Sequence, residues 1–177
     1  MELFFQQGYD NTTVDQIAAK AGISRTSFFR YFATKEEIVL GRVGELGQQV
    51  LQALVARPAG EPVWDALRGA FDPLLELTIA SPERWLAVAR MLSDAPALKA
   101  GQLGRQLSWQ ELLVPEVARR LDIDSEALDT RPRALVASAI ACLNAARDVW
   151  TDSDATVDLP TLLDQAMNAL TGYGVDS

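Results

Sequence analysis

Residues 12–35 hold the local signals that most constrain how this chain can fold. Thr13 can cap a helix, because Gln16 follows three residues later and completes a capping box. Apolar side chains then recur at helical spacing from Val14 to Ala21. This pattern predicts a helix of about two turns with one apolar face.

A short turn follows and leads directly into a second helix. Gly22 can end the first helix in the left-handed conformation, which costs glycine least, and Ser24 can cap the next helix through its hydroxyl. Phe28 and Phe32 are four residues apart and are expected to face inward. Two short helices joined in this way have the geometry that lays a helix in DNA.

The outward face of the second helix carries hydroxyl, guanidinium and aromatic groups, which suit phosphates and base edges. A third helix is expected to start at Thr34, with Glu37 as its capping-box partner. Lys35 would then stand at the first helical position, where free backbone amides and a cation together can grip a phosphate. The candidate DNA-binding residues are Thr13, Ser24, Arg25, Thr26, Ser27, Phe29, Arg30, Tyr31 and Lys35.

The run from Leu3 to Leu40, LFFQQGYDNTTVDQIAAKAGISRTSFFRYFATKEEIVL, resembles the TetR/AcrR transcriptional regulators. It matches nearly every fixed position of that family's DNA-binding pattern. The resemblance implies an all-helical homodimer with three N-terminal helices on DNA and a larger C-terminal helical domain that dimerises and usually holds an inducer. At Phe29 many members have a tyrosine whose hydroxyl reaches a phosphate. The family's first helix also begins well before this motif, so we expect an incomplete first helix here.

We therefore expect an all-α chain with two domains. Residues 1–45 would form the helix-turn-helix DNA-binding domain, and residues 46–177 the ligand-binding and dimerisation domain. Residues 1–57 contain six basic and six acidic side chains of the 16 and 24 in the chain, which leaves ten and eighteen for residues 58–177. The net charge of −8 thus arises outside the candidate DNA-binding part, whose basic character is modest.

The C-terminal part predicts helices throughout, and two of them contain an internal proline. Pro73 lies within a stripe that runs from Trp64 to Thr78, and Pro115 lies within a helix of about residues 98–121. We expect both prolines to kink their helices and so to open a cavity between them. The candidate ligand-binding residues are Trp64, Phe71, Leu75, Thr78, Trp85, Trp109, Leu113 and Asn144. For each aromatic residue alone, ordinary core packing is the alternative.

Two further helices, expected at residues 132–151 and 158–170, resemble helices 8 and 9 of the family, which form its homodimer interface. The first is rich in small residues, which let helices approach closely, and the second is rich in leucine. Packing on their own chain is the alternative. The residues concerned are Ala134, Ala137, Ser138, Ala141, Ala145, Ala146, Leu159, Leu162, Leu163, Ala166 and Leu170.

Composition argues against an enzyme. The chain has no histidine, which excludes Ser-His-Asp and Cys-His nucleophile systems and the common histidine-bearing zinc sites. We expect no catalytic residue, no metal and no cofactor, although a carboxylate-only site stays formally open. Cys142 is the single cysteine and forbids an intramolecular disulfide. With no signal peptide and no apolar run near about 20 residues, we expect a cytoplasmic protein without a membrane partner.

These patterns lead to a hypothesis and one alternative. The hypothesis is a ligand-responsive one-component transcriptional repressor, a homodimer that binds a palindromic double-stranded DNA operator and is released by a small hydrophobic effector. The alternative is an all-helical dimeric small-molecule-binding protein of the same fold that has lost operator binding. The incomplete first helix, Phe29 and the modest basic charge motivate the alternative.

Overall fold

The computed structural model describes residues 1–124 and 128–171, without the side chains of residues 42–44. That part of the chain contains helices and no strand, which confirms the all-α class. The helices are α1 (Glu2–Gln7), α2 (Val14–Lys20), α3 (Arg25–Tyr31), α4 (Glu36–Ala56), α5 (Val63–Ala70), α6 (Asp72–Ala80), α7 (Pro82–Asp94), α8 (Pro96–Arg120), α9 (Arg131–Asp152) and α10 (Leu159–Thr171). Within the described residues, none of these helices combines the length and apolar character needed to cross a membrane.

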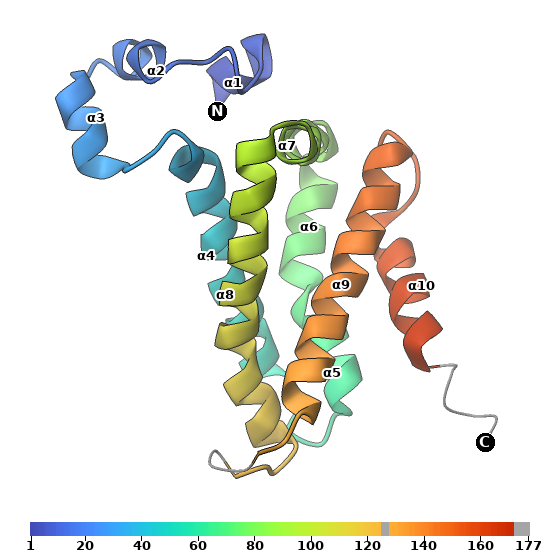
Figure 1. The fold of residues 1–177 in the computed structure, drawn as a ribbon. Coiled ribbons are helices and arrows are strands. Elements are labelled where there is room, and N and C mark those ends of the chain that lie inside the picture. The colour runs from blue at the N-terminus through green and yellow to red at the C-terminus, as the bar shows by residue number, and fades with distance from the viewer. Residues whose placement is uncertain (125–127, 172–177) are drawn as a thin grey trace.

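The short N-terminal helices form a head at one end of a bundle of longer helices (Figure 1). We use "head" for residues 1–35, which hold α1, α2 and α3. In the bundle α4 packs against α8, α8 against α9, and α9 against α10. Helix α4 starts at the head and continues without a break into the bundle, so it joins the two parts.

The main core fills the bundle between α4, α5, α8, α9 and α10. Its fully buried side chains include Leu54, Leu67, Phe71, Leu113, Val136 and Leu163. A second, smaller core lies where the head meets the bundle. There Phe4 and Tyr9 of the head join Val39 and Leu40 of α4 with residues of α7. The head is therefore held by apolar packing on α7 as well as by its covalent link to α4.

The two internal prolines behave differently from each other. The helix is interrupted at Phe71, between the end of α5 and the start of α6. Pro73 is the second residue of α6. In the first turn of a helix the missing proline N–H costs nothing, because amides there have no intrahelical acceptor. The predicted single kinked helix from Trp64 to Thr78 is therefore wrong, and two helices replace it. Pro115, in contrast, lies inside α8, which continues to Arg120.

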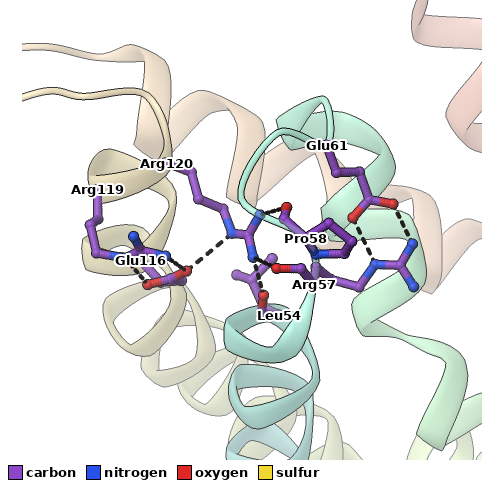
Figure 2. Close-up of polar contacts among 7 residues, drawn as sticks. All are labelled: Leu54, Arg57, Pro58, Glu61, Glu116, Arg119 and Arg120. Carbon is purple, nitrogen blue, oxygen red and sulfur yellow. Dashed lines mark hydrogen bonds and ion pairs between the residues drawn. The ribbon is translucent and has the colours of Figure 1, made fainter.

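Arg120, at the end of α8, ties that helix to the end of α4 (Figure 2). Its side chain is only 2% exposed. The last carbonyl groups of a helix lack the donor one turn ahead, and here the guanidinium adds a donor beside the backbone N–H groups of Arg57 and Glu61. It donates to the main-chain oxygens of Leu54 (2.6 Å), Arg57 (2.8 Å) and Pro58 (3.0 Å).

Glu116 completes this buried polar group from one turn earlier in α8. Its carboxylate accepts hydrogen bonds from Arg119 at 2.7 Å and from Nε of Arg120 at 3.0 Å. The two guanidinium groups, that of Arg119 first, hold the pKa of the Glu116 carboxyl below its ordinary value. A carboxylate with 9% exposure is thus compensated by two cations, as buried charges require.

Helices α4 and α8 also approach closely where Gly47 faces Trp109. A Cβ atom at residue 47 would lie 2.6 Å from Nε1 and 2.8 Å from Cδ1 of the indole ring. We expect Gly47→Ala to lower the free energy of unfolding by about 1–3 kcal/mol, because a rigid buried ring must move.

The matched control is Gly104→Ala on α8, where the added Cβ meets open space. That change should raise the free energy of unfolding by about 0.5–1 kcal/mol through helix propensity. Urea unfolding followed by circular dichroism measures both variants. Equal effects of the same sign would contradict the close approach of α4 and α8.

Candidate DNA-binding face and effector cavity

Helix α2 begins at the predicted capping box. The hydroxyl of Thr13 accepts a hydrogen bond from the backbone N–H of Gln16 (3.2 Å), and the Gln16 side-chain oxygen accepts from the backbone N–H of Thr13 (2.9 Å). Two amides that a helix start leaves without partners are therefore satisfied. This part of the prediction is confirmed.

The turn between α2 and α3 also has the predicted geometry. Gly22 adopts φ +68°, in the left-handed region. The backbone N–H of Ile23 then donates to the oxygen of Ala18 (3.0 Å), which closes the end of α2. Ser24 caps α3, because its hydroxyl accepts from the backbone N–H of Ser27 (3.0 Å). The two helices are thus joined in a fixed relation by a turn of few residues.

Helix α3 buries one face and presents the other to solvent. Phe28 is 1% exposed, and its ring packs 5.4 Å from that of Phe32. The predicted contact residues Arg25, Thr26, Phe29, Arg30 and Tyr31 are exposed, whereas Ser27 is half-buried. The inward and outward assignment of α3 is therefore as predicted except at Ser27, which was expected to face outward.

Each arginine on the exposed face of α3 lies over an aromatic ring. The Arg25 guanidinium carbon lies 5.7 Å from the centre of the Phe29 ring, and that of Arg30 lies 5.0 Å from the centre of the Tyr31 ring. Arg30 also donates to the Tyr31 hydroxyl (3.1 Å). Such contacts hold the guanidinium planes beside the rings. The face thus presents two ordered cations and a phenol to any surface that approaches it.

Two basic groups of the head carry acidic partners. Arg25 pairs with Asp15 of α2 at 3.1 Å, and Lys20 pairs with Glu2 at 2.8 Å. Both pairs are largely exposed, and such surface pairs contribute little. A phosphate could therefore replace Asp15 as the partner of Arg25 at small cost.

Lys35 lies in a different setting from the predicted one. Its ammonium donates to the main-chain oxygens of Tyr9 (2.8 Å) and Thr12 (2.9 Å) and lies 4.0 Å from the centre of the Tyr9 ring. Two of its three donors are engaged inside the head, so one remains for a phosphate. Lys35 thus closes the head against the start of α4.

The predicted start of α4 needs a correction. Glu36, not Lys35, is the first residue of the helix, and Lys35 takes the capping position. The Glu37 carboxylate accepts from the backbone N–H of Ala33 (2.7 Å), so it does not form a capping box with Thr34. Lys35 already has helical backbone angles (φ −64°, ψ −33°), so the two starts differ by one residue, and the capping box fails because Glu37 is bonded to Ala33.

The bundle contains a cavity of about 120 Å³ at the end nearer the head. Its wall is formed by α6, α7, α8 and α9, with one residue each from α4 and α10. Most of the wall is apolar, including Leu75, Val88 and Ile140, and polar groups are concentrated on α8 and α9. This arrangement suits a mainly apolar small molecule.

The cavity includes some of the predicted ligand-binding residues and excludes others. The predicted residues in its wall are Leu75, Thr78, Trp85, Trp109 and Asn144. Phe71 and Leu113 are completely buried in the main core instead, and Trp64 packs against that core. For Trp64 and Phe71 the reason is the break at Phe71, because it separates α5 from the part of the stripe that reaches the cavity. Leu113 lies one turn of α8 beyond Trp109, the last residue of α8 in the wall.

Sequence reasoning missed the charged part of the wall. Arg105 of α8 and Arg147 of α9 both line the cavity, as do Gln102 and Gln106. A signal for Arg105 was present, because it shares a helical stripe with Leu98, Trp109 and Leu113, all buried. A cation inside an apolar stripe is unusual enough to mark a site.

Helix α7 faces the cavity and the head at once. Val88 and Leu92 line the cavity and also belong to the core that holds Phe4 and Tyr9 of the head. These two residues are 7% and 4% exposed, so other side chains of the cavity wall and of the core under the head cover them closely. A change in the cavity wall at α7 is therefore also a change in the packing of the head.

Comparison with known proteins decides the family. The model described as "Bacterial regulatory proteins, tetR family" matches residues 1–41, and the model of the "MftR C-terminal domain" matches residues 61–173. The chain belongs to the TetR family of bacterial regulatory proteins. The first match covers the capped helices and the exposed face of α3, and the second covers the cavity-bearing bundle.

Relatives within the TetR family agree with this assignment. The HTH-type transcriptional regulator TcmR of Streptomyces glaucescens is 37% identical over 143 residues, which cover 77% of this chain and 63% of TcmR. A putative mycofactocin biosynthesis transcriptional regulator, MftR of Mycobacterium tuberculosis, is 28% identical over 99% of this chain and 87% of its own length. The crystal structure of FadR from Thermus thermophilus, a TetR family repressor in complex with lauroyl-CoA, shares the fold with a TM-score of 0.60 and 21% identity. That likeness covers 100% of this chain and 92% of FadR.

Proposed function

We propose that this protein is a ligand-responsive one-component transcriptional repressor. Two copies would bind a palindromic operator through α2 and α3, with residues 1–45 as the DNA-binding domain, and a small, mainly apolar effector in the bundle cavity would release them. The observation that carries the proposal is α7, whose Val88 and Leu92 belong both to the cavity wall and to the core under the head. The cavity wall and the core under the head thereby share side chains of one helix.

Support for DNA binding comes from the exposed face of α3. Its ordered guanidinium groups can donate to phosphates or to guanine edges, and the Tyr31 hydroxyl can donate to a phosphate. Phe29 is 45% exposed, and burial of its ring against a partner would add apolar contact area. A DNA backbone lying along α3 would cover that ring.

Release would follow from a shift between two arrangements of the head. An effector that fills the cavity favours the arrangement in which the α7 wall is moved outward, and the head packed on the other side of α7 moves with it. Two recognition helices that no longer match successive half-sites, about 34–36 Å apart, lose their operator. Helix α4 joins head and bundle covalently and would follow this movement.

Dimerisation through α9 and α10 is part of the proposal. Ala141 and Ala145 are exposed on α9, Val149 is 50% exposed beside them, and Leu170 of α10 is 50% exposed. Other members of the predicted interface, such as Leu163, are buried in their own chain. The exposed small and apolar side chains form the surface that a second copy would cover.

A charge placed on this surface should separate the copies. We expect Ala145→Arg to be monomeric at micromolar concentration, because closely packed helices have no room for a guanidinium. Sedimentation equilibrium measures the mass. The control is Ala100→Arg, at an exposed alanine of α8 that the proposed interface does not include, which should stay dimeric. A dimeric Ala145→Arg protein would place the interface elsewhere.

The experiment that tests the proposed function is binding to the intergenic DNA upstream of the gene, measured at two or more salt concentrations against a scrambled duplex of equal length. Specific binding by a dimer, weakened by salt, is the expected result. Absence of any preference would refute the repressor and leave the alternative, a small-molecule-binding protein of the same fold without operator binding.

A further inference from the structure

Two arginines line an otherwise apolar cavity. Arg105 comes from α8 and Arg147 from α9, and both contribute to the wall together with leucine, tryptophan and alanine side chains. Among the described residues that form this wall there is no aspartate or glutamate. The cavity therefore carries two positive charges and no negative one.

Of the two arginines, Arg105 has fewer interactions that compensate its positive charge. Its Nη1 atom is buried and makes no hydrogen bond within the described part of the chain. Burial lowers the pKa of its guanidinium, the direction expected for a cation that lacks a carboxylate partner. Arginine nevertheless stays protonated in proteins. A residue of the cavity wall thus carries a buried, charged donor without a hydrogen-bond partner among the described residues.

Arg147 is held in place but only weakly neutralised. With the Gln102 amide turned so that its oxygen faces the guanidinium, Gln102 accepts from its two terminal nitrogens at 2.6 and 2.8 Å. The ion pair with Asp148 is long, 3.8 Å, and that carboxylate is 67% exposed. Burial lowers the pKa of the Arg147 guanidinium as well, and Asp148 opposes the shift. Gln102 therefore orients Arg147 without cancelling its charge.

Arg147 also lies between the cavity and a second hollow, and it lines both of them. A second, more polar hollow of about 280 Å³ adjoins the cavity and shares Gln102, Asn144 and Arg147 with it. The second hollow also contains Lys99 and Asp152. One side of Arg147 therefore meets an apolar space, and the other meets polar groups. A ligand with one apolar end and one charged end would fit both sides.

A cation in an apolar wall is costly unless it is paired, and here Arg105 is half-buried with an Nη1 that lacks a partner, while Arg147 has only Gln102 and one long ion pair. We propose that the effector is an amphipathic anion, with an apolar body in the cavity and one carboxylate or phosphate head group bound by Arg105 and Arg147. The planar guanidinium fork matches either oxyanion. This inference rests on the proposed effector cavity and adds the chemical class of the effector.

The test measures ligand binding directly, without DNA. Three of the four tryptophans, Trp85, Trp109 and Trp150, line the cavity, so their fluorescence reports occupancy. Four probes with the same ten-carbon chain are titrated at pH 7: decanoate, decyl phosphate, 1-decanol and decyltrimethylammonium. We expect each of the two anions to bind at least about tenfold more tightly than decanol. The cation should bind most weakly of the four probes.

Two variants assign the head-group contacts. Arg105→Gln and Arg147→Gln should each weaken decanoate binding by about tenfold and leave decanol binding nearly unchanged. Arg84→Gln, at an exposed arginine of α7, is the control and should change neither affinity. Arg105→Met tests folding, because removal of an uncompensated buried cation should keep or raise the melting temperature.

Equal affinity for decanoate and decanol would overturn the inference, and so would decanoate binding that survives both glutamine substitutions. Failure of all four probes to bind would overturn it too. The ratio of decanoate to decyl phosphate affinity tells which oxyanion the site prefers. Since no operator is present, anion-selective binding together with failed operator binding would refute the repressor and leave the anion site standing.

Discussion

Replacing Arg120 by alanine is expected to lower the free energy of unfolding by about 3–5 kcal/mol, the loss typical of removing one partner from a buried charged group. The guanidinium is 2% exposed and donates to three main-chain oxygens at the end of α4 (Figure 2). Without it the Arg57 oxygen loses its donor among the described residues, and the Leu54 and Pro58 oxygens keep only a backbone N–H each. Glu116 loses one of its two cations. Urea unfolding at fixed protein concentration, followed by circular dichroism, measures the loss.

Arg119→Ala is the matched control. Arg119 lies next in the sequence and contacts the same carboxylate, but its side chain is 61% exposed and it donates to no main-chain oxygen of α4 in the described residues. Its removal should cost far less than removal of Arg120. If the two variants lost the same stability, the contacts of Arg120 with the end of α4 would contribute nothing measurable. Arg120→Lys should recover only part of the loss, because an ammonium lacks the guanidinium fork.

The second large effect concerns operator binding by the double variant Arg25→Ala/Tyr31→Ala. Each side chain removed from α3 should cost about 1–3 kcal/mol per head, and a dimer carries every change twice. We therefore expect specific affinity to fall by about a thousandfold or more. The slope of log affinity against log salt should also become shallower by about 2, if Arg25 contacts one phosphate in each half-site.

The control for this experiment is Lys20→Ala on α2. Lys20 is outside the candidate contact set and pairs with Glu2, so its removal should change affinity little. Melting temperatures of both proteins should stay close to that of the unaltered protein, because Arg25 and Tyr31 are mostly exposed. Unchanged operator affinity in the double variant would show that another face of the head meets DNA.

The helix-turn-helix could be predicted because its signals lie within a few residues of each other. Thr13 and Gln16 close a capping box, and Gly22 and Ser24 set the turn, without help from the rest of the chain. The setting of Lys35 could not be predicted in the same way. Its ammonium reaches oxygens more than twenty residues earlier, and no local pattern reports such a contact.

The cavity was only partly predictable from sequence. Helical spacing predicts that Phe71 and Trp85 both face inward. It does not predict whether the neighbouring helices leave a cavity beside these side chains. The break at Phe71 decided the matter, since it moved that ring into the filled core and left Trp85 on the wall. Helices α9 and α10 show the same limit, because Leu163 and Ala145 belong to one predicted set, yet Leu163 is buried in its own chain and Ala145 is exposed.

The position of α7 between cavity and head has a thermodynamic consequence. If Val88 and Leu92 couple an effector to the operator, the coupling free energy is the same in both directions. If the effector lowers the affinity for the operator by a given factor, the operator lowers the affinity for the effector by the same factor. The DNA-bound protein then has the lower affinity for the effector. As the effector concentration rises, the protein that is free of DNA is therefore occupied first.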